Sequence, residues 1–279
     1  MKLCDLHTHS TCSDGKVTPA KLVEMALEIG LAGIALCDHN TVSGLPAFLE
    51  AAKGQQIEAI AGIEFSVNYG KKEYHLLALG IPESRFQEVA ELTRWANEQK
   101  EKSNMALVEA INRDGYALDY DKLKAMVPNG VFNRSHVAEE LTRLGYTESK
   151  KQAFATLLEP DYGYYREPER LMLLDVIPFV KSIGAVPVLA HPFLKTTAEE
   201  LEEVMPLAKE KGLVGMECYY SEYDAETTEK ALEMADKYGL KYSGGSDFHG
   251  SAKPHVSLGV GTGNLQIPYR WWLDMKPTR

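Results

Sequence analysis

Short apolar runs alternate with amphipathic segments along the first 80 residues of the chain. The dipeptide Thr18-Pro19 predicts the start of a helix that continues to Glu28, because threonine is a favoured N-cap and proline fits the first helical turn. A second helix is predicted within residues 45–52, and Tyr69-Gly70-Lys71-Lys72 predicts a turn. The apolar runs themselves predict four strands, at residues 2–6, 32–37, 57–63 and 74–79.

The alternation stops between residues 83 and 171. This stretch shows helical periodicity and loops without a convincing strand, and the periodicity predicts helices at 86–101, 103–113 and 136–144. Breaks are predicted at Gly115, at Pro128-Asn129-Gly130 and at Gly145. We therefore expect residues 83–171 to form a helical insertion.

Strands and helices alternate again after the insertion. Helices are predicted at residues 174–182, 198–211 and 225–238, and strands at 185–190, 213–219 and 241–244. Seven strands in strand–helix order predict a parallel sheet closed as an α/β barrel, because parallel strands need crossover helices and covered faces. The barrel is expected to comprise residues 1–82 and 172–279, with 83–171 as a separate domain.

Composition limits the classes of function. The formal net charge of -10 argues against stable binding to duplex nucleic acid or to a membrane surface. Metals or a local basic pocket could still hold an anionic substrate. The chain has no apolar run long enough to span a bilayer, no signal-peptide pattern and no CxxC among its four cysteines, so a reduced cytoplasmic protein is expected.

Histidines and acidic residues gather at the ends of the predicted strands. Six of the eight histidines lie at or next to strands, and all of these except His75 follow a strand's C-terminal end. In parallel α/β barrels these ends meet at one rim, where active sites are built. The residues concerned are His7, His9, His39, His75, His191 and His249, with Asp5, Asp14, Asp38, Glu64, Glu217 and Asp247.

Three short patterns make a metal site the preferred interpretation. In Asp5-Leu6-His7-Thr8-His9 the alternate side chains share one face of a strand, although an HxH pair alone is as well explained by chance. Glu64 follows an apolar strand and needs either a cation or a basic partner. Asp247 and His249 also share a face. These nitrogen and oxygen ligands suit manganese, iron or zinc.

Together these motifs resemble the PHP (polymerase and histidinol phosphatase) family. The resemblance implies a distorted (β/α)7 barrel with two or three divalent ions, manganese being the first choice and iron or zinc the alternatives. Asp5 and Asp38 would lie behind the metals and orient histidines, and Glu217 would do the same or be a packed, salt-bridged carboxylate. The implied ligands are His7, His9, Glu64 and Asp247 for the first ion, Glu64, His75 and His191 for the second, and Asp14, His39 and His249 for the third.

The long insertion resembles that of the nucleotide phosphoesterase branch of the family. The resemblance implies that the insertion caps the barrel and that Arg134, Ser135 and His136 hold phosphate, with His255 as a weaker candidate. The alternative interpretation of this segment is a helix N-terminus, with Ser135 as the cap and Arg134 in solvent.

The expected reaction is hydrolysis of a phosphomonoester of a 3′,5′-bisphosphonucleotide, or of a short 5′-phosphorylated oligonucleotide. A metal-bridging hydroxide would attack phosphorus in line, while Arg134, His136 and the metals stabilise the phosphoryl oxygens. Two alternatives remain open. One is a phosphatase for histidinol phosphate or another small molecule, and the other is a non-catalytic, metal-stabilised PHP module.

Overall fold

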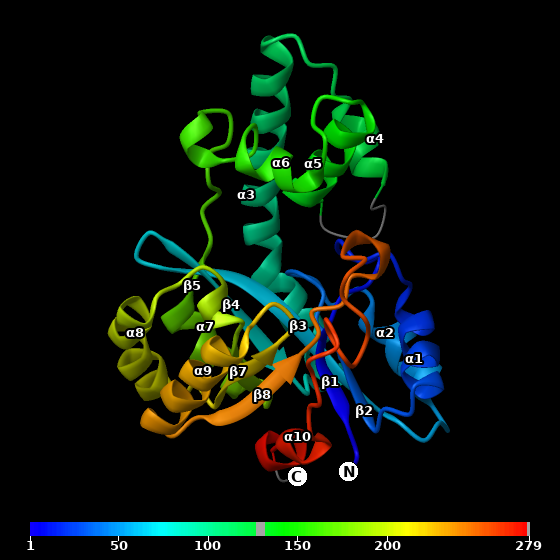
Figure 1. The fold of residues 1–279 in the computed structure, drawn as a ribbon, viewed down its shortest axis with the longest axis vertical. Helices are drawn as coiled ribbons and strands as arrows, with labels where there is room; N and C mark the ends of the chain where they lie inside the picture. The colour runs from blue at the N-terminus through cyan, green and yellow to red at the C-terminus, as the bar shows by residue number, and fades with distance from the viewer. Residues whose placement is uncertain (127–131, 278–279) are drawn as a thin grey trace.

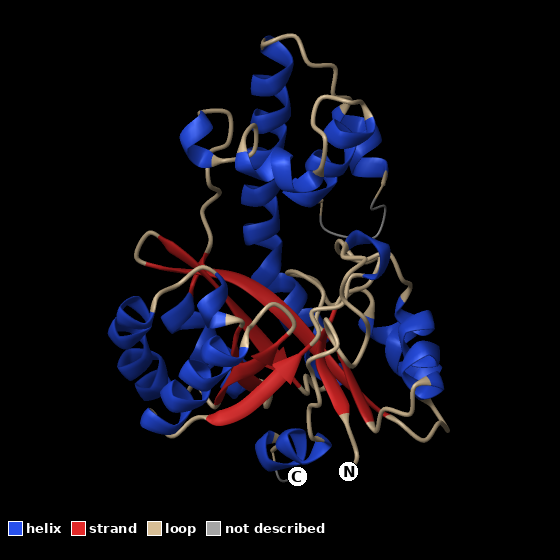
Figure 2. Ribbon diagram, viewed as in Figure 1, coloured by secondary structure: helices blue, strands red, loops and turns tan. Residues whose placement is uncertain are grey.

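A computed structural model describes residues 1–126 and 132–277 of the chain. The break predicted at Pro128-Asn129-Gly130 lies outside the described residues. Figures 1 and 2 show a sheet curved into a barrel, with most helices on its outside and a group of helices projecting from one end.

Seven strands form the barrel, in the order β1-β2-β3-β4-β6-β7-β8, and the short β5 pairs with β3. The barrel is nearly closed, because His9 N donates to Phe248 O and Asp247 N donates to His7 O, both at 2.9 Å. These bonds join β1 to the segment that follows β8. The strands are β1 Cys4–Thr8, β2 Gly33–Leu36, β3 Glu58–Tyr69, β4 Lys72–Leu79, β5 Leu171–Met172, β6 Val186–Ala190, β7 Gly215–Tyr220 and β8 Lys241–Gly245.

The prediction that all seven strands run parallel is wrong at β4, which is antiparallel to both β3 and β6. Only two residues connect β3 to β4, and a parallel pair would need a crossover connection of a dozen or more. The reversal explains why His75 lies near the start of its strand. The start of β4 is at the same end of the barrel as the C-terminal ends of the parallel strands, and His75 pairs with Ala190 at the end of β6.

Two apolar layers hold the barrel together. The larger layer lies between the sheet and the surrounding helices, and the smaller one fills the barrel interior. The C-terminal helix α10 packs Trp272 and Met275 into the smaller layer, and Glu58 accepts a hydrogen bond from Trp272 Nε1 at 2.9 Å. These helices are α1 Pro19–Glu28, α2 Leu45–Ala52, α7 Leu173–Ser182, α8 Ala198–Lys211, α9 Ala225–Lys237 and α10 Tyr269–Met275.

The segment between β4 and β5 is helical and has its own apolar cluster, which includes Leu107, Leu141 and Leu158. The two helices predicted at 86–101 and 103–113 are one continuous 28-residue helix, because no glycine or proline interrupts them. Figure 1 shows this helix rising from the barrel beside the shorter ones. The helices are α3 Phe86–Arg113, α4 Tyr120–Ala125, α5 Arg134–Arg143 and α6 Lys150–Ala155. We found no helix among the described residues that is long and apolar enough to cross a membrane.

Candidate metal centre

The nine side chains expected to bind metal meet at the mouth of the barrel opposite α10. The first group surrounds the two histidines that follow β1. His7 Nε2 lies 3.0 Å from His9 Nε2, and Glu64 Oε2 lies 3.3 and 3.2 Å from these two nitrogens. Asp247 Oδ1 is 3.1 Å from His9 Nε2. Two imidazole nitrogens and two carboxylate oxygens therefore face one point.

Glu64 lies at the centre of the cluster. Its Oε1 is 2.7 Å from His75 Nδ1 and 2.9 Å from His191 Nε2, while its Oε2 is 3.0 Å from His39 Nδ1. The carboxylate is fully buried, so it must be compensated by the groups around it. Its two oxygens face different sets of imidazoles, which is the arrangement that a bridging ligand requires.

A further group of ligands lies around the carboxylate of Asp14. Its Oδ1 lies 3.1 Å from His249 Nε2 and 3.9 Å from both His39 Nε2 and His9 Nδ1. One ligand atom from each of these four residues lies within 4.8 Å of all the others.

Backbone strain is concentrated at the same mouth. Among the described residues, the non-glycine residues with positive φ are Asn40 (48°), His191 (26°) and Asp247 (53°). Two of them belong to the cluster, and Asn40 directly follows His39. Such conformations persist where the surrounding structure imposes them, and they are common at functional sites.

The cluster fits divalent metal ions. Metal–ligand bonds of about 2.1 Å place neighbouring ligand atoms roughly 3 Å apart, which matches the spacings around Glu64. His9 Nδ1, His39 Nδ1 and Glu64 Oε2 are also buried without a hydrogen bond. Buried polar atoms normally have partners, so these three atoms indicate bound cations.

The electrostatics of the cluster also favour a cation. Burial raises the pKa of the Glu64 carboxyl, but the neighbouring imidazoles, His39 foremost, bring it well below its ordinary value. Burial, with a contribution from the charge of His9, lowers the pKa of His39 to about 4 despite the nearby carboxylates. Burial acts likewise on His75, yet Glu64 raises its pKa to about 9. The Glu64 carboxyl is therefore ionised, and His39 is neutral and can offer a lone pair to a metal.

Glu217 orients two members of the cluster. Its Oε1 lies 3.1 Å from His7 Nδ1, and its Oε2 accepts a hydrogen bond from His191 N at 2.8 Å. A carboxylate on the far nitrogen of an imidazole sets the tautomer and the ring direction of a metal ligand. The sequence left open whether Glu217 was such a residue or a packed carboxylate, and these contacts match the first interpretation.

Asp5 and Asp38 differ from their prediction, because their described hydrogen bonds go to no imidazole ring. Asp5 accepts from the backbone N–H groups of Ser246 and Gly259 at 2.9 and 2.8 Å. Asp38 accepts from Ser10 N at 2.8 Å and from Ser13 Oγ at 2.6 Å. Both carboxylates hold the loops that carry ligands, and Asp5 Oδ1 also accepts a hydrogen bond from the backbone N of His7 at 3.3 Å.

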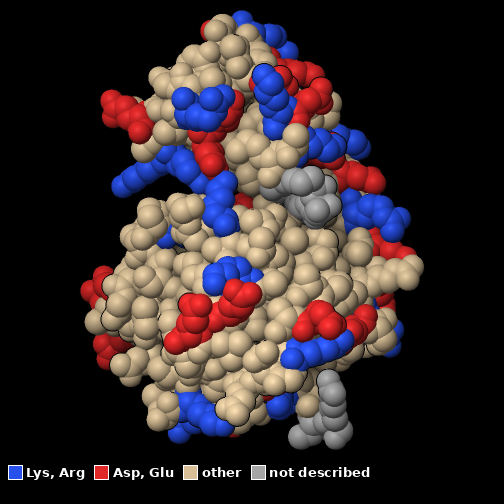
Figure 3. Space-filling view, turned by 90° about the vertical axis from the view of Figure 1, so that its right-hand side faces the viewer, with Lys and Arg blue, Asp and Glu red and all other residues tan. Residues whose placement is uncertain are grey.

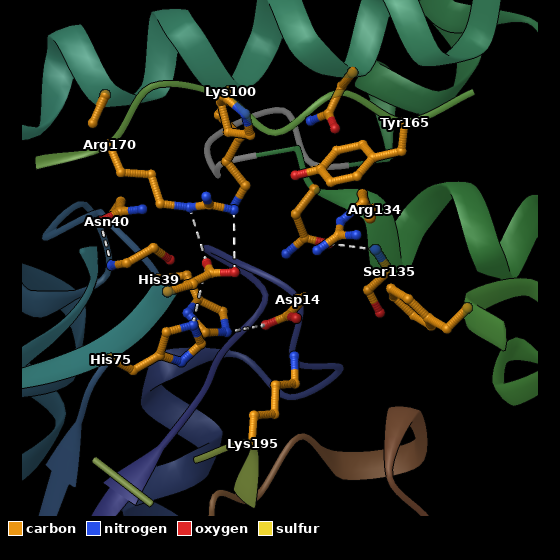
Figure 4. A pocket seen from close by; sticks show the side chains of 17 residues that line it. Asp14, His39, Asn40, His75, Lys100, Arg134, Ser135, Tyr165, Arg170 and Lys195 are labelled. Carbon is orange, nitrogen blue, oxygen red and sulfur yellow. Dashed lines mark hydrogen bonds and ion pairs between the residues drawn. The ribbon is translucent and has the colours of Figure 1, made fainter. Parts of the chain in front are cut away.

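A cavity of about 180 Å³ opens above the cluster, between the barrel and the inserted helices. Asp14, His39 and His75 line it from the barrel, and Arg134 and Ser135 line it from α5. Figure 4 shows Lys100, Arg134 and Arg170 pointing from the inserted segment toward the histidines, with Lys195 approaching from the barrel. The cavity therefore combines the candidate metal centre with several cations.

Arg134 is held in a fixed position at this cavity. Its guanidinium carbon lies 3.9 Å from the centroid of the Tyr165 ring, and its Nη1 donates to Leu158 O at 3.2 Å. These contacts leave other N–H groups of the fork available to a ligand. The alternative with Ser135 as the helix cap is wrong, since Asn133 caps α5 by accepting from Ser135 N at 2.9 Å.

His136 and His255 do not line the cavity. His136 is buried, and its Nδ1 accepts a hydrogen bond from Asn133 N at 3.2 Å, so it completes the cap of α5. Burial lowers the pKa of His136 to about 4, so it is neutral at physiological pH. His255 is largely exposed, 3.8 Å from Glu222. The prediction that both histidines contact phosphate therefore gains no support from this cavity.

Several residues at this site gave no signal in the sequence. Lys100 lies in the middle of α3. Arg170 donates to Glu73 Oε2 at 3.1 Å, and the other carboxylate oxygen of Glu73 lies 3.6 Å from His75 Nε2. Lys253 Nζ lies 2.5 Å from Asp247 Oδ2. None of these cations follows a predicted strand, which was the pattern that marked the metal centre.

A barrel with imidazoles and carboxylates clustered at one mouth, beneath a cationic cavity, defines a metal-dependent hydrolase.

Comparison with known proteins agrees with this class. A family model described as the PHP domain matches residues 5–160, which is more than half of the chain, and the chain belongs to this family. In a solved structure, a candidate metal-dependent phosphoesterase from Bifidobacterium adolescentis has the same fold, with a TM-score of 0.86 and 26% identity. The match covers 98% of this chain and 95% of that one.

Three curated relatives act on different phosphate esters. The chain is 29% identical over 249 residues to a 5′-3′ exoribonuclease of Haemophilus influenzae, covering 89% of this chain and 90% of the relative. It is 28% identical over 247 residues to a 3′,5′-nucleoside bisphosphate phosphatase of Chromobacterium violaceum, covering 88% and 86%. It is 28% identical over 263 residues to a phosphoribosyl 1,2-cyclic phosphate 1,2-diphosphodiesterase of Eggerthella lenta, covering 92% and 98%.

The chain is therefore an enzyme, a metal-dependent phosphoric ester hydrolase. This conclusion excludes the non-catalytic PHP module that the sequence left open.

Proposed function

We propose that this enzyme hydrolyses a phosphate ester of a nucleotide that carries a second phosphate group. The substrate is a 3′,5′-bisphosphonucleotide or a short 5′-phosphorylated oligonucleotide. The single observation that carries this proposal is the cavity in which Lys100, Arg134, Arg170 and Lys195 face Asp14, His39 and His75. One phosphate lies over the metal centre and the other among the cations. The names of the exoribonuclease and the bisphosphate phosphatase support this class of substrate.

The residues that would hold the metals divide into three groups around Glu64. His7, His9, Glu64 and Asp247 form the first, Glu64, His75 and His191 the second, and Asp14, His39 and His249 the third. Divalent ions bound there supply water activation near neutral pH and neutralise charge at the phosphoryl group. Glu217 holds the ring of His7 so that its Nε2 faces the centre.

The side chains of the inserted segment bind and orient the substrate. The guanidinium of Arg134 is held in place and offers its N–H groups to phosphate oxygens, and Ser135 lies beside it at the start of α5. We propose that residues 83–171 act as a cap domain, because they supply Lys100, Arg134 and Arg170 to the cavity. In the reaction, water oxygen adds to phosphorus, the bond from phosphorus to the ester oxygen breaks, and the alcohol leaves with a proton.

A phosphatase for histidinol phosphate or another small monoester is the remaining alternative. Such a substrate has one phosphate and a positively charged or neutral remainder. It would leave Lys100 and Arg134 without a second anion at the cavity, whereas Arg170 is already paired with Glu73. The nucleotide with two phosphates uses both halves of the cavity.

A substrate comparison with manganese tests the proposal. The substrates are 3′,5′-bisphosphoadenosine, a 5′-phosphorylated diadenylate, AMP, histidinol phosphate and a phosphoribosyl 1,2-cyclic phosphate, with products separated by chromatography. We expect kcat/KM for the first two to exceed that for AMP by about a hundredfold, since the second phosphate adds charge-assisted hydrogen bonds. A preference for histidinol phosphate or for the cyclic phosphate would contradict the proposed function.

A further inference from the structure

A second group of cations lies at the other end of the metal cluster from Arg170. Arg170 approaches the His75 end through Glu73, whereas Lys253 contacts Asp247 at the His249 end. Lys16 follows β1, and its backbone N donates to His249 O at 3.0 Å. Lys150 is the first residue of α6 in the inserted segment. We call Lys16, Lys150 and Lys253 the seam lysines, because they lie where the inserted helices meet the barrel.

Contacts with α5 connect the seam lysines to the cavity. Lys150 Nζ donates to Ser135 Oγ at 2.7 Å, and Ser135 lines the cavity. Lys16 Nζ donates to Glu139 Oε2 at 2.7 Å. Ser135 and Glu139 are four residues apart, so they share one face of α5. A continuous path of polar groups therefore leads from the cavity along the seam. Figure 3 shows Lys and Arg side chains gathered beside the indentation between the inserted helices and the barrel.

The charges along this path do not balance once metals are bound. Lys253 is paired with Asp247, whose carboxylate is a proposed metal ligand, and Glu139 is the acidic partner of Lys16. Burial lowers the pKa of the Lys150 ammonium, and the neighbouring charges of Lys16 and Lys253 add to this lowering. Lys16 and Lys150 thus share Glu139, and Glu222 is the carboxylate near Lys253 that metal binding leaves free, so three ammonium groups face two carboxylates. A further anion would neutralise them.

We propose that the seam lysines bind the phosphate that follows the scissile one in a short 5′-phosphorylated oligonucleotide. This inference rests on the proposed function and selects the oligonucleotide over the mononucleotide bisphosphate as the preferred substrate. The terminal 5′-phosphate lies among Lys100, Arg134 and Arg170, the scissile phosphate over the metals, and the next phosphate on the seam lysines. The acidic remainder of the protein, with its net charge of -10, repels longer nucleic acid.

The test combines a protein change with a substrate change. The protein variant is Lys16→Ala/Lys150→Ala, which leaves Lys253 and its contact with Asp247 intact. The substrates are 5′-phosphorylated triadenylate, the same molecule with an uncharged methylphosphonate at the second internucleotide linkage, and 3′,5′-bisphosphoadenosine. Lys151→Ala is the matched control, because Lys151 is an exposed neighbour on the same helix.

We expect the methylphosphonate to lower the wild-type kcat/KM about tenfold, and the double variant to lose about as much on the natural triadenylate. Combined, the two changes should cost no more than either alone, since they remove the same contact. The slope of log kcat/KM against log salt concentration should fall by about 1 for each lysine removed. Lys151→Ala should behave as the wild type with all three substrates.

Two outcomes would overturn the inference in different ways. Independent losses that multiply, or a double variant equally impaired on triadenylate and bisphosphoadenosine, would show that the seam lysines do not contact the following phosphate. Such a result leaves the proposed function in place. Failure of the wild-type enzyme to hydrolyse either natural substrate would overturn the proposed function, and this inference with it.

Discussion

The mouth of the barrel and the cavity beneath the inserted helices use charge in opposite ways. At the mouth, carboxylates and imidazoles are buried against one another, and Glu64 alone lies within 3.3 Å of five histidines. In the cavity, the cations come from segments far apart in the sequence, and Arg134 is held there by Tyr165 and Leu158. From this difference we propose that the barrel supplies the chemistry of hydrolysis and that the insertion supplies selectivity for the substrate.

The largest expected effect is that of Glu64→Gln. The amide cannot bridge cations as the carboxylate does, so bound metal should be lost and kcat should fall on the order of a thousandfold or more, because the ions stabilise the transition state by several kcal/mol. Metal content by elemental analysis and kcat with the best substrate measure both effects. Glu73→Gln is the matched control and should retain its metal. A Glu64→Gln enzyme with full metal content and nearly unchanged kcat would refute the central position of Glu64.

Arg134→Ala should have the next largest effect, confined to substrate binding. Removing a charged fork that binds phosphate costs about 2–3 kcal/mol, so kcat/KM should fall about a hundredfold, mainly through a higher KM. Metal content should stay at the wild-type value. Arg134→Lys keeps the charge but loses the fork and its stacking on Tyr165, and an intermediate loss is expected. If metal disappeared together with activity, the division between barrel and insertion would be wrong.

Glu217→Gln should produce a smaller effect within the barrel. The side chain keeps its size but loses the negative charge that faces His7 Nδ1, so metal affinity should fall about tenfold. A competition titration with a chelator measures the affinity. Asp5→Asn is the matched control, because Asp5 accepts hydrogen bonds from backbone N–H groups. This variant should mainly lower the unfolding temperature. Equal metal affinities for wild type and Glu217→Gln would show that Glu217 does not position His7.

The sequence predicted much more of the mouth than of the cavity, for a physical reason. Strand ends of a barrel converge, so polar residues after successive apolar runs, such as His9 and Glu64, can be placed together without coordinates. The reversal of β4 could also have been inferred, since the two-residue link after Tyr69 excludes a parallel pair.

The cations of the cavity follow no such rule. Lys100 is one charge among many on a 28-residue helix, and its direction depends on how that helix stands on the barrel. His136 is the opposite case, a residue that the sequence assigned to the site. It lies two residues after Arg134, but its side chain completes the cap of α5 instead of facing the cavity. Periodicity predicts which residues share a face of an element, but the packing of distant elements decides which faces meet.

Anomalous diffraction from crystals of protein prepared without chelator, grown with manganese and measured near the manganese absorption edge, tests the central claim most directly. The account predicts two or three strong peaks at the barrel mouth, each within about 2.2 Å of His, Asp or Glu atoms of the nine residues around Glu64. A mouth without anomalous density, with the imidazoles hydrogen-bonded only to protein, would contradict it.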